Sequence, residues 1–84
     1  MNRKQRIYKI LSIKFDKFAL EIIDNSNLHK GHNGFSGNNE SHIKLILTKK
    51  NRTPTNRLNI HRVINTLLAD EFKNGLHSLE IKIN

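Results

Sequence analysis

The amino-acid sequence predicts an α/β (α+β) two-layer sandwich in which two helices pack on a mixed three-stranded sheet. Two segments carry apolar residues at the spacing of an amphipathic helix, and three short segments alternate apolar with polar residues. The expected order is helix, strand, strand, helix, strand. Because a helix separates the last two strands, a right-handed crossover should make them parallel, while the first two should be antiparallel. At 84 residues the chain can form one core, so residues 1–84 are expected to be a single domain.

The first half of the chain supplies one helix and two strands. The strand Ala19–Asp24 is followed by residues 25–41, which are rich in Gly, Asn and Ser and should form a loop. Connections of this length are usually functional or mobile. The strand His42–Lys49 then alternates apolar and polar residues and should be half-buried. The first helix is expected from Arg3 to Phe18, with an apolar face formed by Ile7, Ile10, Leu11, Phe15 and Phe18.

The second half begins with a break at Pro54, after which Thr55 or Asn56 can cap the next helix. Asn74 and Gly75 should end that helix in a left-handed turn. A final strand follows, in which Leu79, Ile81 and Ile83 alternate with Glu80 and Lys82. The helix is expected to carry one unbroken core stripe over more than three turns, formed by Ile60, Val63, Ile64, Leu67, Leu68 and Phe72.

Composition narrows the classes of function. The sequence has no cysteine, which excludes disulfides, thiol nucleophiles and cysteine-based zinc sites. Its serines lack a nucleophile elbow, and the adjacent Asp70 and Glu71 should point to different sides of a helix, so an enzyme is not expected. The sequence shows neither a signal peptide nor an apolar span, which makes the cytoplasm the default location and gives no membrane partner.

The net charge narrows the possible functions less than the composition does. A net charge of +8 and a pI near 10.2 are typical of proteins that bind nucleic acid or another polyanion. The charges are spread along the chain, however, and lysine can also be enriched by AT-rich coding. A solvated surface is therefore as good an interpretation as a binding face. The charged positions include Arg3, Lys4, Arg6 and Lys9 near the start, and Lys49, Lys50, Arg52, Arg57 and Arg62 later.

Five histidines are a high density for so short a chain. Imidazole is well suited to metal ligation and titrates near neutral pH. His29 and His32 are three residues apart among small neighbours, so both rings could approach one ion. Loop histidines are also often unliganded, and zinc or copper binding by this loop alone is a further alternative.

The order and spacing of several short motifs carry a family resemblance. The segments DNSNLHKGHNGFSGNNESHIKLIL and IHRVINTLLADEFKNGLHSLEIK, within Asp24 to Lys82, resemble the BolA family. Its members typically read Asp-Glu-Ser, His, Gly-His, Ser-His-Phe, Arg-His-Arg and Gly-(Ile/Val)-His-Ala-Leu in that order. The resemblance implies a BolA-like domain with a class II KH-like fold, which agrees with the element order derived above.

The resemblance also implies a partner and a cofactor. BolA proteins form heterodimers with monothiol glutaredoxins and share a [2Fe-2S] cluster, to which the glutaredoxin side brings its cysteine and a bound glutathione thiol. This chain has no cysteine, so its share would be imidazole nitrogen, and no cofactor is expected in the isolated chain. By position the C-terminal ligand is His77, and the loop ligand is His29, with His32 next. His42 would anchor a strand edge or loop, and His61 would contact a partner or nucleic acid. The implied role is an adaptor in iron-sulfur trafficking or iron-responsive regulation.

A DNA-binding transcriptional regulator is the alternative that the same resemblance implies. Two departures weaken it, because Arg-Thr-Pro replaces the usual Phe-x-Gly turn and Ile60 replaces the first arginine of Arg-His-Arg. No aromatic residue accompanies the basic ones, so base stacking is unsupported. Whether the chain also forms a weak homodimer is left open by the sequence. The residues that would meet DNA are Lys49, Lys50, Arg52, Arg57, His61 and Arg62.

Overall fold

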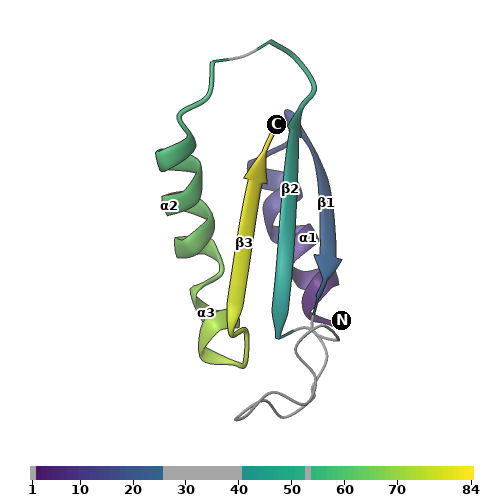
Figure 1. The fold of residues 1–84 in the computed structure, drawn as a ribbon, viewed down its shortest axis with the longest axis vertical. Coiled ribbons are helices and arrows are strands. Elements are labelled where there is room, and N and C mark those ends of the chain that lie inside the picture. The colour runs from purple at the N-terminus through teal and green to yellow at the C-terminus, as the bar shows by residue number, and fades with distance from the viewer. Residues whose placement is uncertain (1, 26–40, 53) are drawn as a thin grey trace.

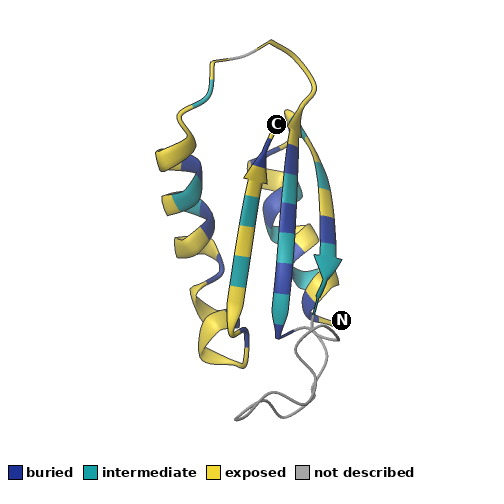
Figure 2. Cartoon of the chain, viewed as in Figure 1, coloured by how far each residue is buried: buried dark blue, intermediate teal, exposed yellow. Residues whose placement is uncertain are grey.

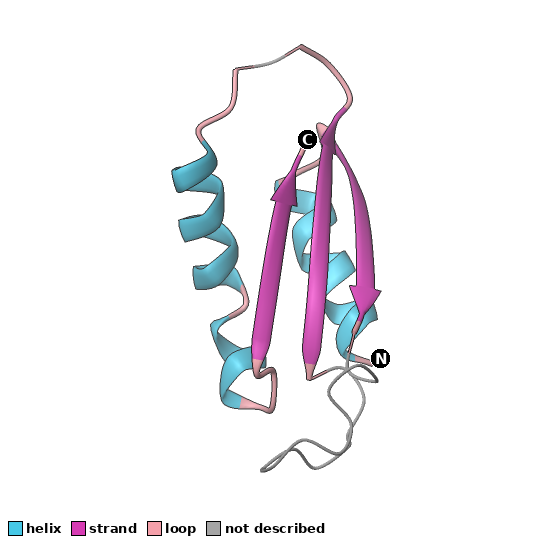
Figure 3. Ribbon diagram, in the orientation of Figure 1, coloured by secondary structure: helices cyan, strands magenta, loops and turns pink. Residues whose placement is uncertain are grey.

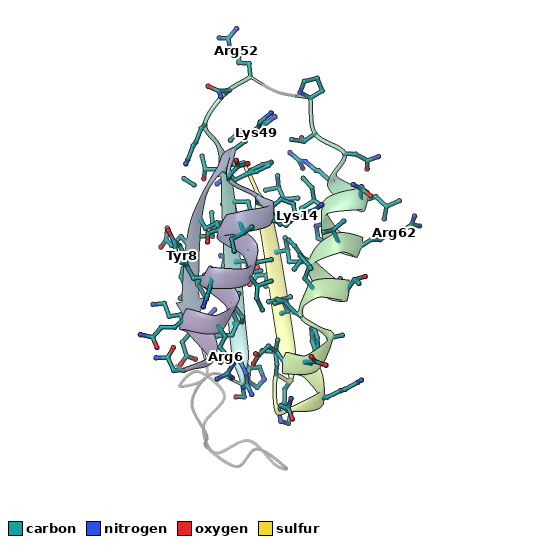
Figure 4. The ribbon with its side chains drawn as sticks, turned by 180° about the vertical axis from the view of Figure 1, so that it is seen from behind. Arg6, Tyr8, Lys14, Lys49, Arg52 and Arg62 are labelled. Atoms are coloured by element: carbon teal, nitrogen blue, oxygen red, sulfur yellow. The ribbon has the colours of Figure 1, made fainter. Side chains whose placement is uncertain are left out.

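The computed structural model describes residues 2–25, 41–52 and 54–84, and these ranges form a three-stranded sheet with helices packed against it (Figure 1). The strands lie in the order β1-β2-β3, so β2 is central. Figure 4 views the molecule from the opposite side, where α1 lies in front of the strands. Figure 3 shows α2 running beside β3. The elements are α1 (Arg3–Lys14), β1 (Phe18–Asp24), β2 (His42–Lys49), α2 (Arg57–Leu67), α3 (Ala69–Lys73) and β3 (Ser78–Ile83).

The strand pairings confirm the predicted mixed sheet. β1 runs antiparallel to β2, in a register that extends from Phe18 opposite Lys49 to Asp24 opposite Ile43. β2 and β3 are parallel, and His42 is paired with Ser78 at the start of both strands. The parallel pair is joined by the α2 and α3 crossover, as a strand-helix-strand connection requires. The sheet therefore brings the starts of β2 and β3 to the same end.

The hydrophobic core lies between the helices and one face of the sheet. Along β2 the buried residues Ile43, Leu45 and Leu47 alternate with half-exposed ones, which Figure 2 shows as alternating dark blue and teal bands. This period of two is the signature of a strand covered on one face. The buried core comprises Ile7, Leu11, Phe15, Ile22, Ile43, Leu45, Leu47, Ile60, Ile64, Leu68, Leu76 and Ile83.

The first helix is shorter than its apolar spacing predicts. It ends at Lys14 with Phe15 as its C-cap, and Phe18 belongs to β1 instead of the helix. A turn separates the two elements, in which the Phe18 N–H donates to the Phe15 carbonyl at 3.0 Å. The helical rhythm of Phe15 and Phe18 therefore reflects two consecutive elements that bury aromatic rings in one core, with centroids 6.0 Å apart.

The second helix is interrupted, and the prediction that its apolar residues form one continuous core-facing surface is wrong at two positions. Leu68 has φ −100° and ψ 13°, far from helical values, and separates α2 from α3. The change of direction leaves Leu67 and Phe72 exposed at 38% and 37%, while Leu68 is fully buried. Glu71 is turned inward instead and is only 7% exposed. Asn56 caps α2, since its side chain accepts from the Asn59 N–H at 3.0 Å.

Candidate functional site

Two histidines meet at the end of the sheet where β2 and β3 begin. The rings of His42 and His77 have centroids 6.0 Å apart and planes inclined by 16°, a stacked arrangement. His77 is exposed and His42 is half-exposed. His77 directly precedes β3, and His42 is the first residue of β2, so the parallel pairing of these strands places the two rings together.

Ser41 contacts both histidines, the backbone of His77 and the ring of His42. Its carbonyl oxygen accepts hydrogen bonds from the N–H groups of His77 at 2.7 Å and Ser78 at 3.1 Å. The Ser41 hydroxyl lies 2.9 Å from Nδ1 of the neighbouring His42 ring. Ser41 itself is only 3% exposed, so these bonds form in a water-poor environment where they are strong. The start of β2 and the residue before β3 are therefore linked through Ser41.

The turn before His77 has a defined geometry. Gly75 has φ +115°, a left-handed conformation that glycine adopts without steric cost. The following Leu76 is buried, and its N–H donates to the Glu71 carbonyl at 2.9 Å, a bond typical of a helix C-terminus. This confirms the predicted Asn74-Gly75 ending. Because Leu76 is anchored in the core, His77 leaves the turn in a fixed direction.

A buried ion cluster, formed by Glu71, Arg3 and Arg6, ties α3 to the start of α1. The Glu71 carboxylate accepts from Arg3 Nε at 2.9 Å and from Arg6 Nε and Nη2 at 2.7 and 2.9 Å. The pKa of Glu71 is lowered from 4.5 to about 2, chiefly by hydrogen bonds from Arg6 and further by hydrogen bonding from Arg3 and by the charges of both arginines, which together outweigh the opposing effect of burial. Arg3 Nη2 also donates to the Asn74 carbonyl at 2.6 Å, next to Gly75.

This ion cluster corrects the sequence interpretation. Arg3 and Arg6 were expected among spread surface charges, but both pair with Glu71, and Arg3 is only 9% exposed. No local pattern identifies the contact, because the partners are separated by 68 and 65 positions in sequence. The one available signal is the spacing of Arg3 and Arg6, which places both on one side of a helix.

The predicted loop ligands and the remaining histidine stand apart from this pair. His29 and His32 lie outside the residues that the structure describes. His61 is half-exposed on α2, where it lines a surface groove with Arg57 and residues of β3. Of the predicted ligands, only His77 is therefore placed, and its neighbour is His42, to which the sequence assigned an anchoring role.

The predicted nucleic-acid residues divide into two groups. Lys49, Lys50 and Arg52 are exposed around a shallow pocket that Asn84 also lines. One of them is engaged locally, since Lys50 Nζ donates to the Asp16 carbonyl at 3.2 Å. Figure 4 shows Arg52 and Lys49 at this end of the molecule. This basic end is opposite the histidine pair, because β2 begins at His42 and ends at Lys49.

The other group lies on α2. Arg57 and His61 are four residues apart and share a groove with Glu80 and Lys82 of β3. Arg62 is exposed and points away from the sheet in Figure 4. The six predicted residues therefore do not form one continuous face.

Comparison with known proteins gives these features a context. The sequence profile of the family described as "BolA-like protein" matches residues 11–84. The chain belongs to the BolA-like family. The UV-induced protein uvi31 of Schizosaccharomyces pombe is 38% identical to this BolA-like chain in an 86-residue alignment that covers 96% of the chain and 82% of that protein.

Two further BolA-like proteins are similar to this chain, one in sequence and one in structure. The DNA-binding transcriptional regulator BolA of Escherichia coli (strain K12) is 33% identical over 78 residues, covering 93% of this chain and 70% of that protein. The solved structure of the BolA domain of SufE1 from Arabidopsis thaliana superposes with a TM-score of 0.79 at 33% identity, covering 100% of this chain and 92% of that one. The mixed α+β fold is thus that of a BolA domain. Within the described part of this BolA-like chain, no helix has the length and apolar character needed to cross a membrane.

Proposed function

We propose that this BolA-like chain is a non-enzymatic adaptor that binds a monothiol glutaredoxin and shares a [2Fe-2S] cluster through histidine ligands. The observation that carries the proposal is His77, an exposed imidazole that follows a fixed turn and is held by a backbone hydrogen bond to Ser41. An exposed ligand on a rigid backbone is what a cluster shared between two proteins requires. The adaptor would act in iron-sulfur trafficking or iron-responsive regulation.

The donor chemistry of this chain fits a shared cluster. The sequence offers no thiolate, and the described residues contain no group of three or more His, Cys, Asp or Glu side chains arranged to hold a metal ion by themselves. Imidazole from this chain and thiolate from the glutaredoxin and glutathione would complete four ligands. A cluster with mixed imidazole and thiolate ligation has a higher reduction potential than an all-thiolate one.

The direct test is to mix the chain with a glutathione-loaded, cluster-bearing monothiol glutaredoxin and record visible absorption and circular dichroism. The wild-type chain should change both spectra, and His77→Ala should abolish the change. Glu21→Ala is the control, because Glu21 is exposed on β1 and its removal takes away no imidazole, so the change should stay intact. An unchanged spectrum with the wild-type chain, or a full change with His77→Ala, would overturn the proposal.

DNA binding is a second candidate function, favoured by the gathering of Lys49, Lys50 and Arg52 at one end of the sheet. A relative that carries the name DNA-binding transcriptional regulator BolA adds to this case. Each phosphate contact should contribute about 0.9 to the slope of log affinity against log salt. Replacing Lys49 and Arg52 together by Ala should therefore lower the slope by about 2.

A matched control for DNA binding is available at the other end of the molecule. Lys73 is exposed at the end of α3, which lies at the end of the molecule where β2 and β3 begin (Figure 1). Lys73→Ala should leave the salt slope unchanged within error. Equal slopes for wild type and the Lys49 and Arg52 double variant would rule out the basic end as the DNA contact.

The two candidate sites can be tested separately because they lie at opposite ends of β2. From His42 to Lys49 the strand advances seven residues, or about 23 Å at about 3.3 Å per residue. A variant at one end should therefore leave direct contacts at the other end intact.

A further inference from the structure

The outer edge of β1 carries backbone groups that pair with no described strand. β1 lies at one side of the sheet, and β2 is its one neighbouring strand among the described residues (Figure 1). The N–H of Asn25, directly after β1, donates to the His42 carbonyl at 2.8 Å, so Asn25 is oriented toward β2. Because this orientation alternates along an antiparallel strand, Leu20 and Ile22 direct their N–H and carbonyl groups to the outer edge.

This edge lacks the features that usually prevent pairing with another chain. Natural edge strands are commonly very short, bulged, or protected by Lys or Pro. β1 has the sequence FALEIID, without Lys or Pro, and it pairs with β2 in continuous register from Phe18 to Asp24. The other edge strand, β3, runs beside α2 (Figure 3) and contains Lys82. β1 is therefore the edge better suited to accept another strand.

A groove follows this edge between β1 and α1. Two depressions of the surface share Tyr8 and Leu20, and they form the β1 groove together. One extends to Lys4 and Ile22, and the other extends to Phe18. Tyr8 is 52% exposed, and Figure 4 shows it on the side of α1 next to β1. The groove thus offers an apolar centre beside the outer backbone groups of β1.

The charges along the β1 groove define which side chains an added strand should carry. α1 has basic residues and no acidic one, and its Lys4 lines the same depression as Ile22. A side chain that faces α1 opposite Ile22 should therefore be acidic. Glu21 points to the other face of the sheet, where its cross-strand neighbour should be basic. An apolar side chain fits opposite Leu20, beside Tyr8.

A second copy of this chain is a poorer occupant of the edge. Antiparallel pairing of two β1 strands about their central residue would place Glu21 opposite Glu21, and like charges directly opposite each other are destabilising. Each chain also carries a net charge of +8, so two copies repel each other. Charge complementarity therefore favours a partner strand of different sequence.

We propose that the β1 groove binds an extended segment of a partner protein, which adds to β1 as an antiparallel strand with the order acidic, basic, apolar from its N-terminal side. In this direction the three residues lie opposite Ile22, Glu21 and Leu20 in turn. Main-chain hydrogen bonds supply affinity, and the alternating side chains supply specificity, as in other complexes formed by strand addition. Binding of this kind requires neither a cluster nor DNA.

The first experiment uses the ¹⁵N-labelled chain and the peptide Thr-Thr-Glu-Lys-Val-Thr-Thr, blocked at both ends, and measures amide hydrogen exchange by NMR. In the free chain the Leu20 and Ile22 amides should exchange faster than those of Glu21 and Ile23, which face β2. With peptide at about ten times its Kd, exchange at Leu20 and Ile22 should slow about tenfold. A Kd above about 1 mM would overturn the proposal.

The peptide-free chain tests whether the edge is open. Slow exchange of the Leu20 and Ile22 amides without peptide would overturn the proposal. Slow exchange that depends on protein concentration would assign the edge to a second copy of the chain. Slow exchange that is independent of concentration would assign it to a segment of the chain itself.

Backbone pairing is tested by methylating single nitrogens of the peptide. In the proposed register the Val N–H of the peptide donates to the Leu20 carbonyl, whereas its Lys N–H points away from β1. Methylation at Val should weaken binding at least about tenfold, because it removes a donor and adds bulk at the edge. Methylation at Lys is the matched control and should change affinity less than about twofold. Equal effects of the two methyl groups would overturn strand addition.

The direction of the added strand is tested by charge reversal. Lys4→Glu should weaken binding about threefold or more, and a peptide with Lys in place of its Glu should restore the affinity. Lys9→Glu makes the same change on α1 at a residue that does not line the groove, and should alter affinity less than about twofold. Equal losses for the two variants would indicate a general attraction and would overturn the proposal.

Discussion

Protonation of Glu71 should destabilise the fold by a predictable amount. Glu71 is 7% exposed, and its carboxylate contacts two arginines from α1, which lower its pKa from 4.5 to about 2. That difference corresponds to about 3 kcal/mol of folding free energy at about 1.36 kcal/mol per pH unit. Because the folded-state pKa is the lower one, the stabilisation is fully present well above pH 4.5 and is lost as the pH falls toward 2.

The assay compares urea unfolding of wild type and Glu71→Gln between pH 7 and pH 2. Other carboxyl groups titrate in both proteins, so the difference in unfolding free energy isolates Glu71. This difference should be largest near pH 7 and should narrow by about 3 kcal/mol by pH 2. Glu21→Gln, at an exposed position of β1, is the matched control and should stay within about 0.5 kcal/mol of wild type throughout. A difference for Glu71→Gln that is constant across this pH range would refute the reasoning.

Three further substitutions probe the elements that position His77 and α2, each measured by urea unfolding at pH 7. Gly75→Ala should cost about 1–3 kcal/mol, because φ is +115° and the new Cβ would lie 3.3 Å from Arg3 Nη2; a cost below about 0.5 kcal/mol would contradict this. Leu68→Ala should cost about 2–5 kcal/mol as a fully buried side chain, whereas the exposed Leu67→Ala should cost much less; equal costs would argue against the break in the helix. Asn56→Ala should cost about 1 kcal/mol by removing the α2 cap, and no change would show that the cap is dispensable.

Much of the fold could be predicted because it depends on local patterns. The alternation of His42–Lys49 predicted a half-buried strand with its observed bounds, and the helix between the last two strands predicted a parallel pair. Asn56, as one of two candidate caps with Thr55, and Gly75 were identified by cap and turn chemistry that acts over a few residues. These features need no knowledge of distant partners.

The parts that could not be predicted depend on contacts across the chain. The helix break at Leu68 turns Glu71 inward and leaves Phe72 partly exposed, although apolar spacing alone favours a continuous stripe. Glu71 pairs there with arginines on α1, far away in sequence. The stacking of His42 on His77 likewise follows from strand register, which spacing within either strand does not reveal.

The central claim is that an imidazole from this chain, His77, binds the cluster of a monothiol glutaredoxin. The reduction potential of that cluster is the most direct measurement, taken for the glutaredoxin alone and in the presence of the chain. The claim predicts a more positive potential with the wild-type chain, because imidazole replaces thiolate, and no change with His77→Ala. An identical potential with and without the wild-type chain would contradict it.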